Sequence, residues 1–456
     1  MSSYFARAPR RFAGGGKQAS SSCNSGPASG SHPADPTATA AQRVSDSIDE
    51  DIRKAAAAQQ GGATQAIIIL GQAESGKSTL QKQFQLYYAS QTLDADRPSW
   101  RIVVYANLIK AVRTIVEELE YDFSQAYEEY PWPGPIDAGA ENEFHTLRRD
   151  LLPLISLESS LTAQLSDGIS FVGKRSASLF TTKQGLTRLT GTRPLGVLLD
   201  APAAVVATNR AGQVLGMSVG AIEALWGHRM VQGLLRTRKL RLEESGSFFL
   251  GEVHRIAQPD YVPTTDDVLR VRLQTIGVVE HSIPVKTAGG THLWKIYDVG
   301  GVLSQRAAWA SYFDDVNALI FVAAISAFDQ YLEEDPLTNR ISDSLQLLAI
   351  ICANPLLKNA QLVLLLNKTD ILRRKLEAGI QIRDYIISYG SRTNNFYTAT
   401  EYFRSHFLSA HKKRETFKRT LFVHLTSLVD VAGTQSVIAS VQDTIIRKHV
   451  VRSKLM

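Results

Sequence analysis

A glycine-rich turn between an apolar run and a helical pattern constrains this chain more than any other feature. Positions 65–88 read QAIIILGQAESGKSTLQKQFQLYY, and the turn has the spacing G-x-x-x-x-G-K-S. In a strand–loop–helix unit, the loop N–H groups and the helix N-terminus surround phosphate groups. Lys77 is then expected to reach the outer phosphates, and the Ser78 hydroxyl to ligate Mg²⁺. The expected phosphate-binding residues are Glu74, Ser75, Gly76, Lys77, Ser78 and Thr79.

A second polar turn, NKTD at positions 367–370, follows the apolar run QLVLLL. A carboxylate at Asp370 can accept two N–H groups that guanine offers and adenine does not, while Lys368 can lie along the base. Alone, Asn367 and its neighbours are also typical of an ordinary turn after a strand. After a phosphate loop, in this order, the turn predicts a guanine-specific site for GTP and GDP.

A third turn, YDVGG at positions 297–301, ends another apolar run. Asp298 is expected to hold Mg²⁺ through water, and the Gly301 N–H to meet the terminal phosphate. An ordinary strand-to-loop turn is the alternative for this stretch too. The three turns together predict a GTP site with Mg²⁺ at one edge of a sheet.

The second half of the chain alternates apolar strands with helical patterns after position 263. The expected strands are THLWKIYDV, ALIFVAAI, QLVLLLN and TLFVHLT, and the expected helices cover 341–352, 380–388 and 436–450. This alternation predicts an α/β fold with a parallel sheet and a ligand site at the strand C-terminal ends.

The first half follows a different pattern. Helices are expected at 100–120, at 147–165 and within 221–256, because apolar residues recur there at helical spacing. The stretch around 181–219 is rich in Gly, Thr and Ala, and we interpret much of the region 122–220 as an insertion with loops.

Composition excludes several classes of protein. The chain has 456 residues, 44% of them hydrophobic and 21% charged, which is ordinary for a soluble globular protein with two or three domains. A net charge of +6, with no basic-aromatic pattern, gives no reason to expect nucleic acid as a partner. No run approaches about 18 apolar residues, so no membrane span is expected. Two cysteines, Cys23 and Cys352, make a disulfide framework untenable and favour a reducing compartment, with Cys352 in a buried helix.

The first 44 residues are rich in Ser, Gly, Ala and Pro, and we expect a disordered tail. A mitochondrial transit peptide is the alternative, because the segment bears Arg and almost no acids. Ser2 follows Met1, so the glycine that myristoylation needs is absent, while palmitoylation of Cys23 stays open. Positions 45–60 are expected to form a helix.

With these features, the chain resembles the α subunit of a heterotrimeric G protein. The resemblance covers about residues 45–456, apart from residues 122–220. The stretches that carry the resemblance are ESGKST, LWGHRMVQ, RIAQPDYVPTTDDVLRVR, TIGVVE, YDVGG, NKTD and VQDTIIRKH. The resemblance implies a Ras-like P-loop GTPase domain at 65–86 and 268–456, with an all-α helical domain inserted at 87–267. A tail at 1–44 and an N-terminal helix at 45–64 would precede them.

The resemblance also assigns roles to residues that no turn pattern identifies. It implies that Arg272 is catalytic and neutralises charge on the transferring phosphoryl group, and that Thr275 joins Ser78 as a Mg²⁺ ligand. Taken without the resemblance, Arg272 could be a surface ion-pair residue and Thr275 a strand residue. The further residues expected at the nucleotide are Ser245, Leu269, Arg270 and Leu428.

The chain departs from the family pattern where hydrolysis would occur. Ala73 stands in place of a glycine, and Val302 replaces the glutamine that orients the attacking water. Loss of one such positioned polar group costs around two to three orders of magnitude in rate. Gln305 lies about one helical turn further on, and we do not expect it to reach the water. We therefore expect nucleotide binding to survive and hydrolysis to be slow.

Other departures fall on partner and base contacts. Leu428 replaces an alanine, keeping the N–H that meets guanine but crowding the base, and Gln274 replaces a lysine. Charged family residues also give way to apolar ones after the third turn, at Leu303, Ala307 and Ala308.

The leading hypothesis is a slowly hydrolysing α-subunit-like switch in receptor signalling. The implied partners are a βγ complex, a G protein-coupled receptor at the C-terminal helix and an unknown effector. The implied location is cytoplasmic, with peripheral association at the inner face of the plasma membrane. One rival is a scaffold that stays GTP-bound or empty. A P-loop ATPase or kinase is the other, and Asp370 disfavours it.

Overall fold

The computed structural model describes residues 64–126, 138–165, 169–172, 178–181, 202–237, 240, 242–273, 275, 277–287, 290–314 and 316–453. The expected tail and all but Thr64 of the expected N-terminal helix lie outside these residues. Gln65–Pro284 and Trp294–Met456 form one compact unit, and Val285–Leu293 belongs to a second one. No helix of the described residues is long and apolar enough to cross a membrane.

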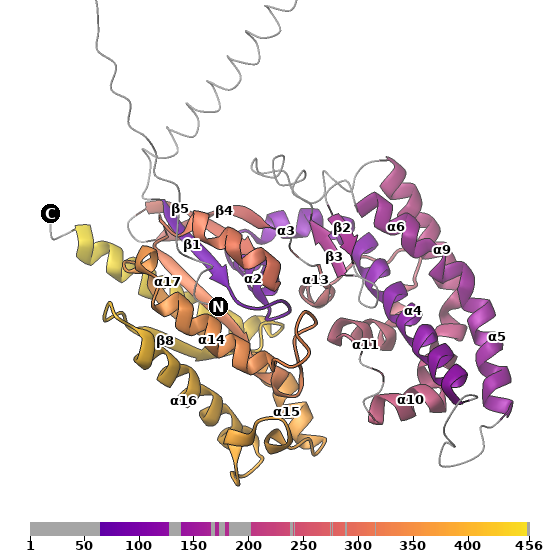
Figure 1. The fold of residues 1–456 in the computed structure, drawn as a ribbon. Coiled ribbons are helices and arrows are strands. Elements are labelled where there is room, and N and C mark those ends of the chain that lie inside the picture. The colour runs from indigo at the N-terminus through magenta and orange to yellow at the C-terminus, as the bar shows by residue number, and fades with distance from the viewer. Residues whose placement is uncertain are drawn as a thin grey trace, which may run out of the picture. The chain divides into compact units, whose positions relative to one another are not determined.

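A six-stranded sheet organises one part of the chain, in the order β4-β5-β1-β6-β7-β8 (Figure 1). Every neighbouring pair from β5 to β8 runs parallel. The strands are β1 (Gln65–Leu70), β4 (Val278–Thr287), β5 (Gly290–Val299), β6 (Ala318–Ala324), β7 (Gln361–Asn367) and β8 (Leu421–Leu425). The expected parallel sheet is confirmed, and β4 is an edge strand that the apolar runs did not predict. The carboxyl ends of β1, β5 and β7 meet at one edge, which brings the three polar turns together.

Apolar side chains explain why these strands lie in the middle of the fold. All six residues of β1 and all seven of β6 are buried, as expected for a parallel sheet covered on both faces. Helices carry the buried faces that cover it, and Trp309, Phe321, Phe403 and Phe407 are among the core residues. The helices of this part are α2 (Lys77–Tyr88), α14 (Arg340–Cys352), α15 (Thr369–Glu377), α16 (Phe396–Arg414) and α17 (Val431–Ser453).

The helices expected at 341–352 and 436–450 are confirmed within α14 and α17, but the one at 380–388 is wrong. That segment holds two short 3₁₀ turns, Ile382–Asp384 and Ile387–Tyr389. Gly379 (φ 82°) and Gly390 (φ 61°) bracket it with positive φ angles, which a right-handed helix cannot continue through. The longer helix α16 starts instead after Asn395, whose side chain accepts from the Thr398 N–H at 2.8 Å.

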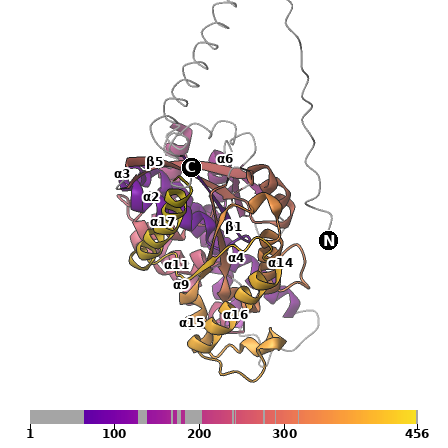
Figure 2. The same ribbon diagram turned by 90° about the vertical axis from the view of Figure 1, so that its left-hand side faces the viewer.

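A group of helices forms the second part of the fold, around its own apolar core (Figures 1 and 2). Its elements are α3 (Ser90–Asp96), α4 (Trp100–Ala126), α5 (Ala138–Ile155), α6 (Leu157–Leu165), α9 (Pro202–Gly227), α10 (Arg229–Arg236), α11 (Glu244–Gly251), α12 (Val253–Ile256) and α13 (Thr265–Arg270). The central helix α4 confirms the one expected at 100–120. The single helix expected at 147–165 is two helices, and it begins earlier. A two-stranded sheet, β2 (Ile169–Val172) with β3 (Ser178–Thr181), lies between α6 and α9 in sequence.

The expectation of loops up to position 219 is wrong from Pro202 onwards, where α9 begins. Ala211, Leu215 and Ile222 recur at helical spacing and are fully buried. One of the glycines that suggested a loop, Gly212, allows close approach of α4. A Cβ on Gly212 would lie 3.0 Å from an Arg101 side-chain nitrogen and 3.1 Å from the Tyr105 hydroxyl of α4.

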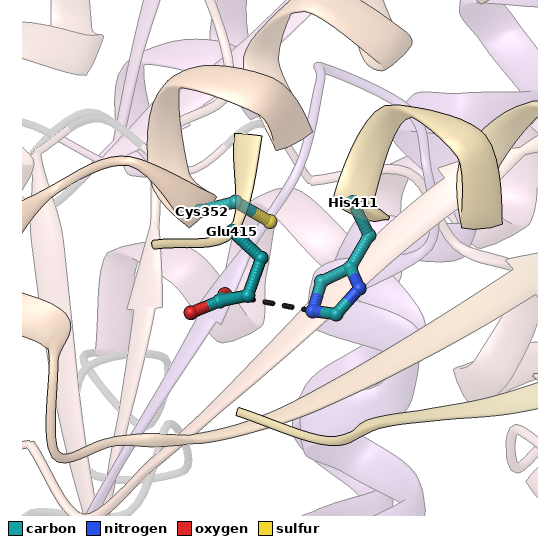
Figure 3. Close-up of side chains that lie close together, drawn as sticks. All are labelled: Cys352, His411 and Glu415. Carbon is teal, nitrogen blue, oxygen red and sulfur yellow. Dashed lines mark ion pairs between the residues drawn. The ribbon is translucent and has the colours of Figure 1, made fainter. Parts of the chain in front are cut away.

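Cys352 is a buried helix residue, as expected, and its thiol lies near His411 and Glu415 (Figure 3). One ligand atom of each residue lies within 4.8 Å of the others, so the group has the composition of a metal site. However, Arg419 donates to both carboxylate oxygens of Glu415 at 2.8–3.1 Å and to the Cys352 carbonyl at 2.5 Å. Burial also raises the pKa of the Cys352 thiol to about 12. The guanidinium already neutralises the carboxylate, so this cluster ties α14 to the end of α16.

Candidate nucleotide-binding site

The phosphate loop, residues 71–78, joins β1 to α2 and needs glycine at two positions. Gly71 has φ 146°, and a Cβ there would lie 2.2 Å from the Val322 carbonyl oxygen of β6. Gly76 has φ 107°, and its Cβ would lie 2.3 Å from Asn367 Nδ2. The loop therefore follows its path because no side chain stands between it and the two neighbouring strand ends.

Lys77, the first residue of α2, lies inside this loop. Its Nζ donates to the carbonyl oxygens of Gly71 at 3.0 Å and Gln72 at 2.6 Å. Burial lowers the pKa of Lys77 to about 8, and the Asp298 carboxylate partly opposes that effect. A buried ammonium that donates hydrogen bonds to neutral loop carbonyls is a suitable partner for phosphate oxygens.

Three predicted Mg²⁺-site residues come together from three separate elements. Ser78 Oγ donates to Asp298 Oδ2 at 2.6 Å and lies 3.1 Å from Thr275 Oγ1, which donates to the same carboxylate oxygen at 3.2 Å. The other oxygen, Asp298 Oδ1, is buried and has no hydrogen-bond partner among the described residues. Two hydroxyls and a carboxylate with a spare oxygen fit a hard divalent cation such as Mg²⁺. These three residues and the phosphate loop are called the phosphate region below.

Arg272 lies just after α13 and points at the phosphate loop. Its guanidinium forms ion pairs with Glu74, at 2.5 Å, and with Glu243. Asn107 of α4 holds the Arg272 backbone on both sides, accepting from its N–H at 3.0 Å and donating to its carbonyl at 3.3 Å. Asn107 was not predicted. The sequence feature that could have identified Asn107 is an amide side chain within the apolar face of a long helix.

Glu74 is the centre of a small charge network. Its left-handed backbone (φ 59°) directs the carboxylate to Arg272 and to Arg340, which lies 3.3 Å away. Burial by itself would raise the pKa of Glu74, but the two guanidinium groups outweigh it, and the pKa falls to about 2. This network joins the phosphate loop to the segment just after α13 and to α14.

The predicted base-binding residues lie at the ends of β7 and β8. Asn367 Nδ2 donates to the Ser75 carbonyl at 2.7 Å, and Asn367 Oδ1 accepts from the Leu428 N–H at 3.1 Å. A guanine carbonyl would therefore compete with Asn367 for that N–H. Lys368, in a left-handed conformation (φ 64°), pairs with Glu244 at 2.9 Å. The Asp370 carboxylate lies 3.5 Å from Arg374 one turn along α15.

The remaining predicted residues lie on the helical side. Ser245 is buried near the start of α11, directly after Glu244. The carbonyl of Leu269, in α13, accepts from the Thr79 hydroxyl at 3.4 Å. Arg270 lies over the Phe248 ring and pairs with Asp266 at 3.1 Å, so its guanidinium is engaged within the helical part.

The switch segment, residues 301–309, begins at Gly301. A Cβ on Gly301 would lie 2.4 Å from Ala73 N and 2.5 Å from Lys77 Nζ, so its backbone lies against the phosphate loop. Val302 is half-buried and starts a 3₁₀ helix, Leu303–Tyr312. Trp309 Nε1 donates to the Gly300 carbonyl at 2.9 Å, which packs the segment onto the end of β5.

Gln72, an unusually large residue for such a loop, links these two regions. Its Nε2 donates to Asp343 Oδ2 at 2.5 Å and to the Arg340 carbonyl at 2.8 Å. Arg306 of the switch segment donates to both oxygens of Asp343, at 2.9 and 2.7 Å. Gln72 and its partner Asp343 lie 271 residues apart in the chain, so no local pattern predicts this contact.

Residues 42–445 of the chain match the sequence profile of the family described as "G-alpha: G-protein alpha subunit". The chain belongs to this G-protein α-subunit family. It is 30% identical to the guanine nucleotide-binding protein alpha-15 subunit of Caenorhabditis elegans, over 90% of this chain and 94% of that protein. It is 28% identical to the alpha-4 subunit of Mycosarcoma maydis (85% of this chain, 83% of the relative). It is also 28% identical to subunit alpha-13 of Rattus norvegicus (84% and 85%).

The family membership confirms the resemblance and the expected fold class, a Ras-like P-loop GTPase fold with a helical part. The chain is a guanine-nucleotide-binding α subunit of the G-protein signalling class, and this is a family of GTPases. The rival ATPase or kinase interpretation is thereby excluded.

Proposed function

We propose that this Gα chain binds GTP with Mg²⁺ and hydrolyses it slowly, as a long-lived signalling switch. The observation that carries the proposal is the contact of Ser78, Thr275 and Asp298, beside the buried ammonium of Lys77. These residues supply oxygen ligands and a cation where a triphosphate and its metal need them. The departures at Ala73 and Val302 fall beside this constellation, in the part that would serve hydrolysis.

In this proposal each residue acts on charge or position. The loop N–H groups and Lys77 bind the phosphates, and Ser78 and Thr275 ligate Mg²⁺, with Asp298 orienting them. A bound Mg²⁺ ion supplies charge neutralisation on the phosphate oxygens. Arg272, when released from its carboxylate partners, brings a guanidinium to the phosphoryl group that is transferred.

The guanine contacts and the domain division belong to the same proposal. Asn367 holds the phosphate loop, Asp370 accepts from the guanine edge, and Lys368 lies along the base. We assign 65–86 and 268–456 to the Ras-like domain and 87–267 to the helical domain. The supporting observation is that the two parts have separate apolar cores.

The proposed partners follow from membership of a family whose members act in G-protein signalling. They are a βγ complex, a G protein-coupled receptor at the C-terminal helix, and an effector at the switch segment. The proposed location is the cytoplasmic face of the plasma membrane, by peripheral association.

The first experiment is to release the nucleotide from freshly purified full-length protein by denaturation and to separate it by chromatography. Mostly GTP supports failed hydrolysis in a competent pocket. Mostly GDP means that the remaining residues suffice for turnover, and it contradicts the slow switch.

Single-turnover hydrolysis of the double variant Ala73→Gly/Val302→Gln then tests the cause. Restoring one positioned polar group should raise the rate roughly tenfold or more. An unchanged rate would contradict our account of the defect.

A second candidate function is a scaffold that does not cycle. It is favoured by the Leu428 N–H, which Asn367 already occupies, and by the engagement of Arg272 with two carboxylates. Lys77→Ala separates the two candidates. The Lys77→Ala variant supports the scaffold, and not the switch, if it no longer binds nucleotide but still binds βγ. Its βγ binding should then be the same at every nucleotide concentration.

A further inference from the structure

The amide of Gln305 lies over the end of β5, close to the phosphate region. Its Oε1 is 1.5 Å, and its Cδ 2.7 Å, from the point that a Cβ on Gly300 would occupy. The Thr275 carbonyl oxygen lies 2.7 Å from the same point. The Gln305 amide and the Thr275 carbonyl are therefore neighbours, and the Thr275 hydroxyl belongs to the Ser78–Thr275–Asp298 contact.

The local backbone explains how a residue three positions after Val302 reaches this place. Val302 is extended (φ −66°, ψ 146°), and the Gln305 N–H donates to its carbonyl at 3.0 Å, so the chain turns back on itself. Gly300 has no side chain to exclude the amide. Its N–H is held by the Gly277 carbonyl at 2.8 Å, which fixes the strand end. This tight turn brings the Gln305 amide back over Gly300, which its spacing along the helix does not predict.

The position of the Gln305 side-chain oxygen is energetically unfavourable. Gln305 Oε1 is buried and has no hydrogen-bond partner among the described residues. It lies close to the Thr275 carbonyl oxygen, another acceptor. An unpaired buried acceptor is destabilising. Two adjacent acceptor oxygens suit a molecule with two donors, such as water. Rotation of the amide about its last torsion can also present its NH₂ group to the same place.

We propose that Gln305, together with the Thr275 carbonyl, orients the attacking water, because the apolar side chain of Val302 cannot hold it. The inference rests on the proposed function. In the reaction the water oxygen forms a bond to the γ-phosphorus, and the bond from that phosphorus to the bridging oxygen of GDP breaks with its electron pair. GDP and inorganic phosphate leave, and a water proton passes to phosphate or solvent. Gln305 is a positioning residue, and it gives the chain its residual hydrolysis.

The test uses full-length protein with Gln305→Met, which keeps the chain length and removes both polar groups. A second variant, Gln305→Ala, guards against poor packing, and Gln346→Met on the exposed face of α14 is the matched control. For each protein we would measure the single-turnover hydrolysis rate with Mg²⁺, the affinity for a non-hydrolysable GTP analogue, and the melting temperature with GDP.

A water-positioning role predicts that Gln305→Met and Gln305→Ala lower the hydrolysis rate by about tenfold or more, while analogue affinity stays within about threefold. Gln305→Met should keep or raise the melting temperature, because it removes an unpaired buried acceptor. In the Val302→Gln background, Gln305→Met should cost much less, since the new glutamine takes over the role.

Other outcomes overturn the inference. Rates within about twofold of the parent, or a lower melting temperature with reduced analogue affinity, would make Gln305 a purely structural residue. A parent that binds GTP but shows no hydrolysis leaves no role for Gln305 and supports the scaffold. A parent that does not bind GTP contradicts the proposed function itself, which distinguishes the two failures.

Discussion

The phosphate region and the switch segment lie in contact, yet they differ in how closely they keep the family pattern. In the phosphate region, the loop glycines, Lys77 and the three oxygen-bearing side chains all have the expected neighbours. In the switch segment, Val302 brings a side chain that can neither donate nor accept. Under the proposed function, this difference assigns binding and hydrolysis to separate residues. Lys77 and the oxygen-bearing side chains hold the nucleotide, while hydrolysis also requires that the attacking water be held in place.

The largest effect that would test this comparison is expected from Lys77→Ala. The variant removes the ammonium that neutralises phosphate charge, so affinity for GTP and GDP should fall by about a hundredfold or more. Equilibrium titration with a fluorescent nucleotide measures it, with exposed Lys358→Ala as the control. A loss below about fivefold would mean that the phosphate region does not bind nucleotide.

A smaller effect is expected from Asn367→Ala, which cuts the tie between the phosphate loop and the end of β8. The Ser75 carbonyl and the Leu428 N–H would lose their buried partner, so the free energy of unfolding should fall by about 2 kcal/mol. Urea unfolding with GDP present measures the change, and exposed Asn209→Ala is the control. A stability equal to that of the parent would show that the loop does not depend on this tie.

Gly301→Ala tests the boundary between the two regions. The new methyl group would press on Ala73 N and Lys77 Nζ, next to the expected terminal phosphate. We therefore expect GTP affinity to fall by about tenfold and GDP affinity by less than about threefold, because only GTP needs that space. Gly233→Ala, whose Cβ would meet nothing within 4 Å, is the control. Equal losses for both nucleotides would contradict a specific role at the terminal phosphate.

The smallest effect concerns the charge network, through Glu74→Gln. The pKa of Glu74 in the folded protein is about 2, below the ordinary 4.5, so the unfolded chain takes up the proton first as the pH falls. The stabilisation is therefore present above about pH 4.5 and is lost towards pH 2. The variant should be less stable by about 1 kcal/mol near neutral pH, and this gap should shrink below about pH 4.5. Urea unfolding at several pH values measures it, and a gap independent of pH would contradict the ion-pair account.

Local patterns predicted much of the fold, and the misses have local causes. The strands β1, β6 and β7 were readable because a parallel sheet buries continuous apolar runs. The strands β5 and β8 are only partly buried, and their apolar residues alone made them readable. The edge strand β4 was not, since its residues have no such run. The helix α9 was missed because a glycine inside a helix, such as Gly212 where α4 approaches closely, looks in sequence like a glycine of a loop.

The candidate site divides in the same way. The three polar turns were predicted because each follows its strand directly, and a parallel sheet brings such turns to one edge. Asn107, Asp343 and the position of Gln305 could not be predicted, because each acts through a partner far away in the sequence or through a turn of the backbone.

The sequence alone determined the class of the chain. The residues of each turn are close together in sequence, so their spacing can be recognised without the fold. This holds for the phosphate loop, the guanine turn and the Asp298 turn. Only the tertiary structure decided which side chains face one another across the sheet edge. Contact between residues hundreds of positions apart depends on packing, which is why Gln72 pairs with Asp343, Arg272 with Glu74, and the Gln305 amide lies beside Thr275.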